Sequence, residues 1–578
     1  MLLVHHAGIA ASSHHASARQ QIRSFASLVA LVLVVTLLNC LKPVHMDDTY
    51  YHEYATQIAS QPLDPYGFDL TWGTYSRPAR HALAPPVFLY WFAAGLRLFG
   101  NNPILWKIWL TGFHAIFVGA LYGVFRRFAA PLQLALTWLT VLSAGFLPGL
   151  NMMLDIPALG LGILALVLFV RAVDCDSSAR AVLAGLVAGL AVETKYTALV
   201  MPAVMSVYAV LNRKPRLAFF STTAAAAVFC AWEAFVIWRY GESNFWFNVR
   251  DQNGSPIGKW LHLALPLATL AGGVAPAVAL LGLAALKLPP RLLLAAIGLV
   301  VAGYLAIAVV PDAYTVFWRN AATGKPRLTL NNVVFGALGA MLFAATLALV
   351  RKLLSWDHGT GSARAAERRV DWFLISWLIL EVGGYFVLSP FPAVRRIIGI
   401  LVPLTVLCGR LAARALLETR AIMAVRWAAL ASACLGLMVF AIDLREAFAE
   451  QRAAEVVAQR LRAETFQGTA WCLGSWGFQF YAQRAGLSSA APDRSRLRAG
   501  DILIVPDPPL CIDELVLASD RFEAIDHILV TDCLPVRTVS CYYGGRTPVE
   551  HHEGPRIALT VYRVLGDGAV STVRRPGK

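Results

Sequence analysis

The sequence predicts a polytopic α-helical membrane protein that ends in a small extramembrane α/β domain. Of its 578 residues, 57% are hydrophobic and only 15% are charged, and the mean hydropathy is +0.58. These values exclude an ordinary soluble protein of this length. Apolar runs recur from about residue 27 to about residue 443, each close to the ~20 residues that cross a hydrocarbon core. We therefore expect a membrane domain over 1–443 and an accessory domain over 444–578.

The first apolar segment, 27–44, follows Arg19 and Arg23 and so has the charge pattern of a signal peptide. It is long for such a segment, LNCLKPV offers no small-x-small cleavage site, and many further spans follow. We interpret it as the first span. The preceding HHAGIAASSHH favours a cytoplasmic tail or a misassigned start over a metal site.

The formal charge of +15 does not indicate a nucleic-acid partner, because many basic residues lie in short connections between apolar runs. Basic residues in such loops favour the cytoplasmic side. With the amino terminus inside, the successive cytoplasmic markers are Arg126 and Arg127; Arg171 and Arg180; Arg213, Lys214 and Arg216; Lys287 and Arg291; Arg351, Lys352, Arg364, Arg368 and Arg369; and Arg410, Arg414 and Arg420.

These markers predict about thirteen spans with the carboxyl end outside. Residues 181–211 have basic flanks at both ends, so we expect a hairpin of two short helices there, which brings Glu193 and Lys195 to the outer half of the membrane. The predicted outer segments are 45–104, 240–260, 311–330, 389–396 and everything after 443. In the first of them, YYHEYATQIAS and PVFLYWFAAGLRLF read as amphipathic helices.

The carboxyl-terminal segment combines a helix pattern with several strand patterns. DLREAFAEQRAAEVVAQRLRAE is polar with an apolar stripe, and GTAWCLG, DILIVP, HILVTDCL and IALTVYRVL are strand-like. It has no nucleophile triad, phosphate loop or metal spacing, so we expect an accessory domain that contacts the acceptor. Its cysteines either form disulfides in an oxidising compartment or stay reduced in the core, and both readings remain open. They are Cys472, Cys511, Cys533 and Cys541.

Three carboxylates are predicted to lie at the outer membrane boundary, where charge is costly unless it is solvated, paired or used. Asp47 and Asp48 directly follow the first span, and Asp155 opens a later one. Each aspartate is suited to cap a helix, and each is equally suited to orient an attacking hydroxyl or take its proton. Lys195 is predicted on the same face, where it either reaches toward the lipid headgroups or binds phosphate.

Five motifs occur in order along the chain. They are DDTYY at Asp47, Asp48 and Tyr51; LAPPVFLYWFAAGLRLFG at Pro85 and Pro86; MLDIPAL at Asp155; GLAVETKYTAL at Lys195; and SPFPAVRRIIGILVP at Arg395 and Arg396. Together they resemble the GT-C superfamily of membrane glycosyltransferases, in the branch of protein O-mannosyltransferases and lipid A aminoarabinose transferases. The resemblance covers most of the membrane domain.

The resemblance implies transfer of a sugar from a polyprenyl phosphate to a lipid, glycan or protein acceptor, by inverting displacement at the outer face of a bacterial inner membrane. Asp47 is the expected base, with Asp48 and Asp155 positioning the acceptor or assisting with charge. Lys195 is the first candidate to stabilise the leaving phosphate, followed by Arg395 and Arg396. No cofactor is required, although a divalent metal between carboxylates and phosphate is conceivable.

The sequence departs from the family pattern in two places. Ala84 stands where many relatives have lysine before the double proline, so that phosphate contact must come from Arg77, Arg80, His81 or elsewhere. Arg395 is followed by a second arginine and isoleucine rather than by tyrosine. Tyr51 and His81 are the expected substrate-binding residues.

Two other classes of protein compete with this interpretation. A transporter or flippase of lipid-linked sugars would place charges along a translocation path and would show repeated halves with broken helices. The sequence shows no such repeat. A structural membrane scaffold would leave the acidic outer site unexplained.

Overall fold

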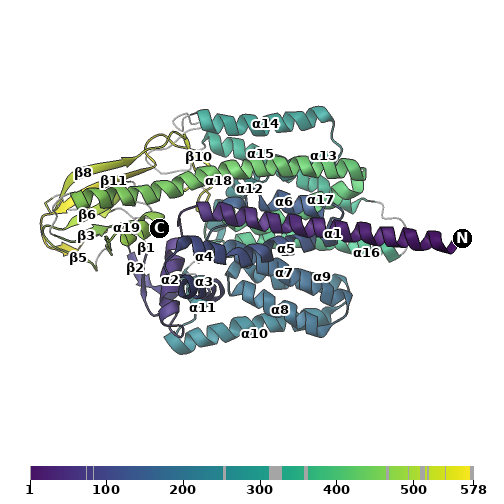
Figure 1. Cartoon of the computed structure of the whole chain (residues 1–578), viewed down its shortest axis with the longest axis horizontal. Coiled ribbons are helices and arrows are strands. Elements are labelled where there is room, and N and C mark those ends of the chain that lie inside the picture. Colours follow the sequence, from purple (N-terminus) through teal and green to yellow (C-terminus); the bar gives the residue numbers. More distant parts are fainter. Residues whose placement is uncertain are drawn as a thin grey trace.

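The computed structural model describes residues 2–72, 75–82, 84–251, 256–310, 329–356, 362–463, 468–474, 476–491, 494–507, 515–516, 520–539, 542–569 and 571–572. Most helices run along the long axis of the molecule, and the strands gather at one end, away from the amino terminus (Figure 1). This arrangement confirms the predicted fold class, a helical membrane protein with a small strand-containing region.

Helices long and apolar enough to cross a membrane number nine within the described residues, or ten if one bent pair is counted as a span. That pair, α12 (Pro256–Val274) and α13 (Pro276–Ala285), bends by 79°. The predicted count of about thirteen spans is not established by these helices. The nine candidate spans lie in the following helices of the described residues: α1 (Leu2–Leu41), α4 (Pro103–Trp109) together with α5 (Thr111–Phe128), α7 (Asp155–Asp174), α10 (Pro215–Tyr240), α14 (Pro290–Val309), α15 (Leu330–Leu354), α16 (Ser362–Leu388), α17 (Val394–Ala415) and α18 (Glu418–Ala463).

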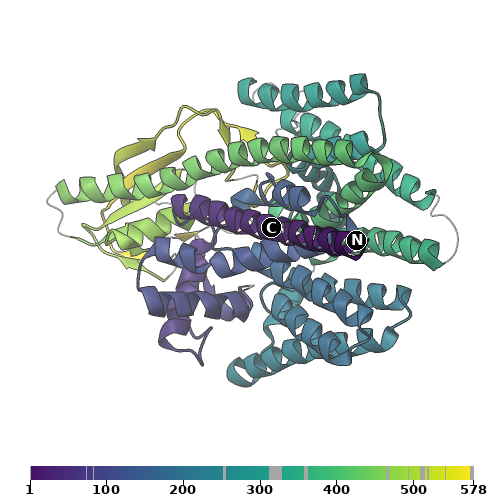
Figure 2. The same ribbon diagram turned by 45° about the vertical axis from the view of Figure 1, so that its right-hand side comes forward.

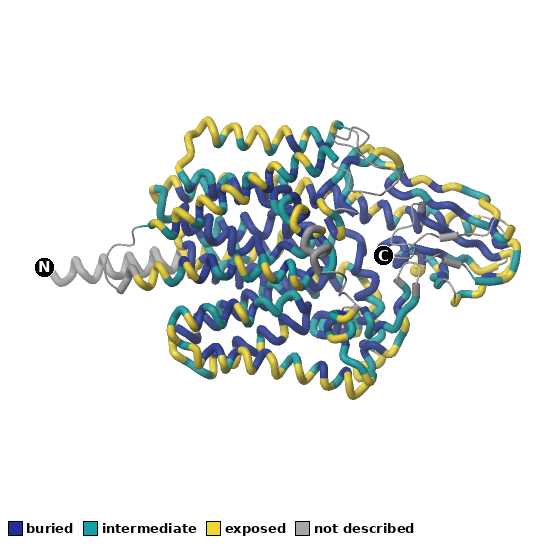
Figure 3. The backbone as a smooth tube through the Cα atoms, turned by 180° about the vertical axis from the view of Figure 1, so that it is seen from behind, coloured by how far each residue is buried: buried dark blue, intermediate teal, exposed yellow. Residues whose placement is uncertain are grey.

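Helix α14 stands at the edge of the bundle in both views (Figures 1 and 2). Its side chains are largely exposed, with Leu294 at 67% and Val309 at 74%. Exposed residues follow the outside of the bundle more generally, as the yellow stretches of the outer helices show (Figure 3), and many of them are large and apolar. An apolar outer surface of this kind is suited to contact lipid rather than water.

The predicted hairpin is present as α8 (Ser178–Val192) and α9 (Val200–Leu211), joined by the turn η3 (Tyr196–Leu199). Helix α8 packs closely on α10 through two glycines four residues apart. A Cβ at Gly185 would lie 2.1 Å from the carbonyl oxygen of Ser221, and one at Gly189 would lie 2.7 Å from Cβ of Val228. Small residues with this spacing let two membrane helices approach closely.

The first outer loop folds against the end of the bundle. Both predicted amphipathic helices form, as α2 (Asp48–Ser60) and α3 (Pro86–Phe99). Between them lie the antiparallel strands β1 (Asp69–Trp72) and β2 (Tyr75–Pro78) and the short helix η1 (Ala79–His81). The remaining helices of the membrane part are α6 (Gln133–Val141), η2 (Leu147–Gly149) and α11 (Asn244–Asp251).

Helix α18 crosses the predicted domain boundary without a break. The sequence suggests a span followed by a separate polar helix, whereas the structure has one helix of 46 residues. No loop marks residue 443, because the polar half continues the same helical stripe and packs on the terminal sheet. The division into 1–443 and 444–578 stays a prediction.

The terminal sheet has five strands in the order β4-β3-β6-β11-β8. The predicted strands all form, although β8 begins five residues earlier than HILVTDCL and ends at Val530. The elements of this part are β3 (Ala470–Cys472), α19 (Trp476–Arg484), β4 (Ser488–Ser489), β5 (Arg496–Leu497), β6 (Ile502–Asp507), β7 (Leu515–Val516), β8 (Phe522–Val530), β9 (Val536–Arg537), β10 (Glu550–His551), β11 (Ile557–Val564), β12 (Gly568–Ala569) and β13 (Ser571–Thr572).

Strand β3 runs parallel to β4 and β6, and β11 runs antiparallel to β6 and β8. One face of the sheet packs on the carboxyl-terminal half of α18 through a core that includes Ala453, Val457, Phe478 and Ile504. Cys472 is buried and Cys533 exposed, and both are free thiols. The other two cysteines of the predicted set, Cys511 and Cys541, lie outside the described residues.

A buried polar network fastens the terminal part to the bundle. Asp443 of α18 forms an ion pair with Lys42 and accepts hydrogen bonds from Tyr543 at 2.8 Å and Thr538 at 3.0 Å. His45 lies 2.8 Å from Glu450, and Arg556 lies 2.5 Å from Glu446. Since these side chains are almost fully buried, removing one member would leave its partner uncompensated.

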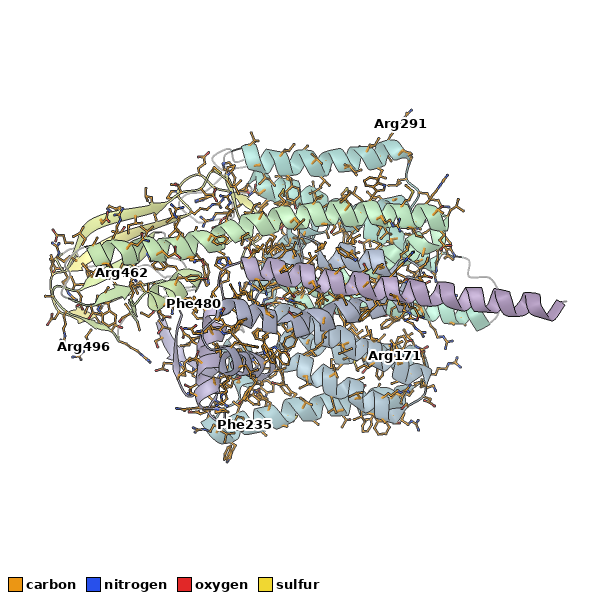
Figure 4. All side chains as sticks on the ribbon, in the orientation of Figure 1. Arg171, Phe235, Arg291, Arg462, Phe480 and Arg496 are labelled. Carbon is orange, nitrogen blue, oxygen red and sulfur yellow. The ribbon has the colours of Figure 1, made fainter. Side chains whose placement is uncertain are left out.

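Basic residues mark both ends of the molecule. Arg171 and Arg291 lie toward the end that carries the amino terminus, whereas Arg462 and Arg496 lie on the terminal domain (Figure 4). The first pair belongs to the predicted cytoplasmic markers, and both of its members lie on the end away from the strands. Which end faces the cytoplasm stays a prediction.

Candidate active site

Five of the predicted site residues meet at the end of the bundle that faces the strand domain. Asp47 immediately precedes α2, Asp155 opens α7, Lys195 lies between α8 and η3, and Arg395 and Arg396 stand in the first turn of α17. Nη1 of Arg395 donates to Oδ2 of Asp47 at 2.6 Å. Lys195 Nζ donates to Oδ1 of Asp155. Four distant segments of the chain therefore form one ion-pair cluster.

The capping explanation does not account for Asp47. It occupies the N-cap position of α2, yet its side chain makes no capping hydrogen bond. Its carboxylate instead bonds to Arg395, which lies 348 residues away in the chain. The side chain of Asp155 likewise bonds to Lys195, although its place in the first turn of α7 also suits the helix dipole.

The start of α17 is held by the terminal domain. Ala393 is extended, and the N–H of Val394 donates to the carbonyl oxygen of Tyr542 at 3.0 Å. Tyr542 is fully buried, and its hydroxyl donates to the carbonyl oxygen of Gly145 at 3.1 Å. This contact fixes the turn in which Arg395 and Arg396 stand.

Tyr51 lies inside the cluster. It interacts electrostatically with Asp47, Asp155, Arg395 and Arg396, and burial, helped by the charge of Asp47, raises the pKa of its hydroxyl well above the usual value. The hydroxyl therefore stays protonated and can donate or accept a hydrogen bond. Its ring packs edge to face on Phe88 at 6.1 Å.

Arg396 is the cation with the most unused hydrogen-bonding capacity. Among the described residues, Nε and Nη1 of Arg396 have no hydrogen-bond partner although both atoms are buried. Its guanidinium lies over the ring of Phe391, 5.0 Å from the centroid. In Arg395, by contrast, Nη1 is occupied by Asp47, and Nε is the one buried donor without a partner among the described residues.

The cluster carries an excess of positive charge. Lys195, Arg395 and Arg396 face two carboxylates, Asp47 and Asp155, so three positive charges meet two negative ones. Unused guanidinium donors with one net positive charge are suited to bind a phosphate.

A cavity of about 60 Å³ adjoins the cluster between α7, α9, α16 and α17. Its lining combines the charged side chains of Asp155, Arg395 and Arg396 with apolar side chains, among them Leu159, Met201 and Ile398. It is much smaller than the 300–1,000 Å³ typical of ligand pockets. A large ligand could enter only if the surrounding helices moved apart.

Asp48 lies outside this cluster. Its carboxylate accepts a hydrogen bond from the backbone N–H of His45 at 3.2 Å, and the cations that act on it electrostatically are Lys107, Lys42 and His45. Burial raises the pKa of Asp48 to about 6, against the opposing effect of the two lysines. The sequence groups Asp48 with Asp47, whereas in the structure Asp47 bonds to Arg395 and Asp48 bonds to the backbone of His45.

The arginines of the first loop also lie elsewhere. Arg80 and His81 contact the carboxylate of Glu242 at 2.5 and 2.7 Å, and His81 stacks on Phe247. Arg77, on β2, lies close enough to Tyr54 to interact with it electrostatically. In this structure none of the three bonds to Asp47 or Asp155, and a role in phosphate binding stays a prediction for each.

Two site residues were missed at the level of sequence. Glu381 and Tyr385 of α16 line the cavity next to the arginines, and Oε1 of Glu381 accepts a hydrogen bond from Trp377 at 3.1 Å. The signal was available for Glu381, since a carboxylate within the apolar run LILEVGGYF is costly unless it has a function. The part of the chain that the structure describes contains no group of three or more metal-ligating side chains.

Comparisons with known proteins agree with the motifs. Residues 83–238 match the family profile described as dolichyl-phosphate-mannose-protein mannosyltransferase. A crystal structure of ArnT from Cupriavidus metallidurans bound to undecaprenyl phosphate aligns with 92% of this chain and 97% of that chain, at 14% identity and a TM-score of 0.39. That likeness is too weak to support a conclusion. No curated protein matches the chain.

The matched segment contains Pro85, Pro86, Asp155 and Lys195, and it ends before Arg395. It therefore covers the part of the site on α7 and the α8–α9 turn. This match agrees with the resemblance found in the motifs: over residues 83–238 the chain is similar to the dolichyl-phosphate-mannose-protein mannosyltransferases.

Proposed function

We propose that the protein transfers a sugar from a polyprenyl phosphate to an acceptor hydroxyl at the outer face of a bacterial inner membrane. The observation that carries the proposal is the cavity beside the ion-pair cluster, whose lining is divided between charged and apolar side chains. A polyprenyl phosphate has the same division, because its phosphate is charged and its chain is soluble in lipid. The family profile, described by a dolichyl-phosphate donor, supports the same class of donor.

In this proposal the donor phosphate binds first to Arg396, whose Nε and Nη1 are without partners among the described residues. Nε of Arg395 and, after release from Asp155, Nζ of Lys195 supply further donors. The negative charge on the phosphate grows as its bond to the sugar breaks, so fixed cations stabilise the transition state more than the ground state.

Asp47 is the proposed general base. The acceptor oxygen attacks the anomeric carbon, the bond from that carbon to the phosphate oxygen breaks, and the acceptor proton passes to the carboxylate of Asp47. The products are the glycosylated acceptor and the polyprenyl phosphate. Attack opposite to the leaving phosphate inverts the configuration at the anomeric carbon.

The ion pair between Asp47 and Arg395 has a consequence for the order of events. While Arg395 holds Asp47, its guanidinium occupies Oδ2 of the carboxylate, so that oxygen is not available to take the acceptor proton. When Arg395 turns toward the donor phosphate, Oδ2 of Asp47 becomes free to accept the proton of the acceptor hydroxyl. Donor binding would thus activate the base.

The experiment that tests the proposal is transfer in proteoliposomes. Purified protein receives a panel of radiolabelled polyprenyl-phosphate hexoses, pentoses and amino sugars, with a membrane extract as the source of acceptors. We expect label from at least one donor to appear in a product other than the lipid donor. Labelled lipid that crosses the bilayer without any transfer would contradict the proposal and indicate a flippase.

A further inference from the structure

A second cavity lies between the first outer loop and the terminal domain, away from the ion-pair cluster. This groove is bounded by α2, the β1 strand and α19, and its volume is about 360 Å³. Helices α2 and α19 lie against each other where the strand domain meets the bundle (Figure 1). The volume falls within the range of ligand pockets in proteins.

The walls of the groove carry amides, hydroxyls and one carboxyl group. Helix α2 contributes Glu53, Thr56, Gln57 and Ser60, and the terminal domain contributes Gln479, Gln483 and Ser489. Phe68, the imidazole of His52 and the hydroxyl of Thr71 also line it. The described lining residues include neither lysine nor arginine, so the groove lacks the cations that would bind a phosphate or sulfate.

Gln479 brings a buried hydrogen-bond acceptor to the groove. The residue is only 1% exposed, and its Nε2 donates to Oε1 of Glu53 at 3.3 Å. Its Oε1, however, has no hydrogen-bond partner among the described residues. A buried amide oxygen without a donor is costly, so a bound molecule that donates a hydrogen bond would satisfy it.

Glu53 complements this acceptor. Burial raises the pKa of its carboxyl group to about 8, so the group is mostly protonated at neutral pH and can both donate and accept. His52, which also lines the groove, packs on Trp106 at 5.0 Å and on Phe480, which Figure 4 labels on α19. The wall is therefore rigid, neutral and rich in groups that both donate and accept.

We propose that this groove binds an uncharged saccharide, as the carbohydrate portion of the acceptor. Sugar hydroxyls both donate and accept hydrogen bonds, as the amides, hydroxyls and protonated carboxyl group of the groove require, and the flat face of a sugar ring can pack on Phe68. An acyl chain would leave these polar groups unpaired, and an anionic headgroup would find no cation.

The position of the groove suits an extended acceptor. Glu53 lies five residues beyond Asp48 along α2 and Ser60 lies twelve, which at the helical rise corresponds to roughly 8 and 18 Å from the start of the helix. A saccharide held there would place a distant unit in the groove while another part reached Asp47. As an acceptor subsite, the assignment rests on the proposed transferase function.

Binding of neutral oligosaccharides to the purified full-length protein in detergent tests the inference. The probes are disaccharides to tetrasaccharides of hexoses and N-acetylhexosamines, measured by calorimetry. We expect at least one probe to bind the wild type. Gln479→Leu and Gln483→Leu should weaken that binding about ten-fold, through the loss of hydrogen bonds. Gln483 is exposed, so its replacement is not expected to disturb folding.

Two further variants sharpen the result. Glu53→Gln keeps a neutral group that donates and accepts, so it should bind like the wild type, whereas Glu53→Leu should not. Gln451→Leu, on the exposed side of α18 and bonded to Glu455, is the matched control and should bind like the wild type. Binding of undecaprenyl phosphate should be unchanged in every variant, which separates this groove from the proposed donor site.

Three outcomes would overturn the inference: no probe binds the wild type, the two glutamine variants bind like the wild type, or an unstructured Ser/Thr-rich peptide competes for the groove while saccharides do not. If the wild type binds saccharides but transfers no sugar in proteoliposomes, the transferase proposal is contradicted and the saccharide groove is not.

Discussion

The substitution Arg396→Gln should weaken the binding of polyprenyl phosphate more than any other single change in the cluster. Nε and Nη1 of Arg396 are both buried and without partners among the described residues, so both are available to a phosphate. Hydrogen bonds to a charged group contribute about 1.5–3 kcal/mol each. Two such bonds at the lower value amount to ~3 kcal/mol, which corresponds to a roughly hundred-fold loss of affinity.

Arg395→Gln is the informative comparison. Its Nη1 already bonds to Asp47, which leaves Nε as the one buried donor without a partner among the described residues. Losing one bond of about 1.5 kcal/mol predicts a roughly ten-fold loss. The two adjacent arginines should therefore differ by about a factor of ten, although their sequence setting is nearly the same.

The assay is equilibrium binding of tritiated undecaprenyl phosphate to the purified protein in detergent. Arg291→Gln serves as the control, since Arg291 lies at the opposite end of the molecule (Figure 4). An Arg396→Gln affinity within three-fold of the wild type would refute the reasoning. So would a larger loss in Arg395→Gln than in Arg396→Gln.

Three further predictions concern stability and orientation. Asp443→Asn should destabilise the protein by about 3–5 kcal/mol, because it leaves Lys42 buried without its counter-ion. Thermal unfolding of this variant is compared with that of the exposed control Glu455→Gln, and equal melting temperatures would contradict the prediction. Burial lowers the pKa of His45, but Glu450 and Asp443 together raise it from 6.5 to about 9. Its charge therefore stabilises the fold fully below about pH 6.5, and this contribution, on the order of 3 kcal/mol, is lost as the pH rises through about 9. The variant His45→Gln should flatten the dependence of melting temperature on pH over that window. An unchanged profile would contradict the stabilising interaction of His45 with Glu450 and Asp443. A cysteine in place of Trp246, which is 68% exposed, should react with an impermeant maleimide in intact cells, whereas one in place of Arg171 should react only after permeabilisation; the reverse pattern would invert the topology.

Much of the fold could be predicted from composition and periodicity. The helices of the first loop, the α8–α9 hairpin and the strands of the terminal sheet all carry local patterns that survive in the structure. The unbroken course of α18 could not be predicted, because a change from lipid-facing to sheet-facing side chains alters composition without altering helical period. The placement of Tyr542 beneath α17 depends on a contact between segments far apart in the chain, which no local pattern encodes.

For the site, the sequence selected the residue types but not their partners. The sequence alone does not distinguish Asp47 from Asp48, because both are aspartates at the start of the same helix. Neighbouring residues of a helix point about 100° apart, so only Asp47 faces Arg395. Arg80 and His81 were grouped with the phosphate ligands because their partner, Glu242, lies beyond several spans. The unused donors of Arg396 became visible only once the partners of Lys195 and Arg395 were known.

The adjacent aspartates give the most direct test of the central claim that Asp47 is the base. Sugar transfer in proteoliposomes should be compared for the wild type, Asp47→Asn and Asp48→Asn at equal amounts of folded protein. The account predicts that Asp47→Asn loses transfer by at least a hundred-fold, as removal of a general base does, while Asp48→Asn retains it. Full activity in Asp47→Asn, or equal loss in both variants, would contradict the assignment.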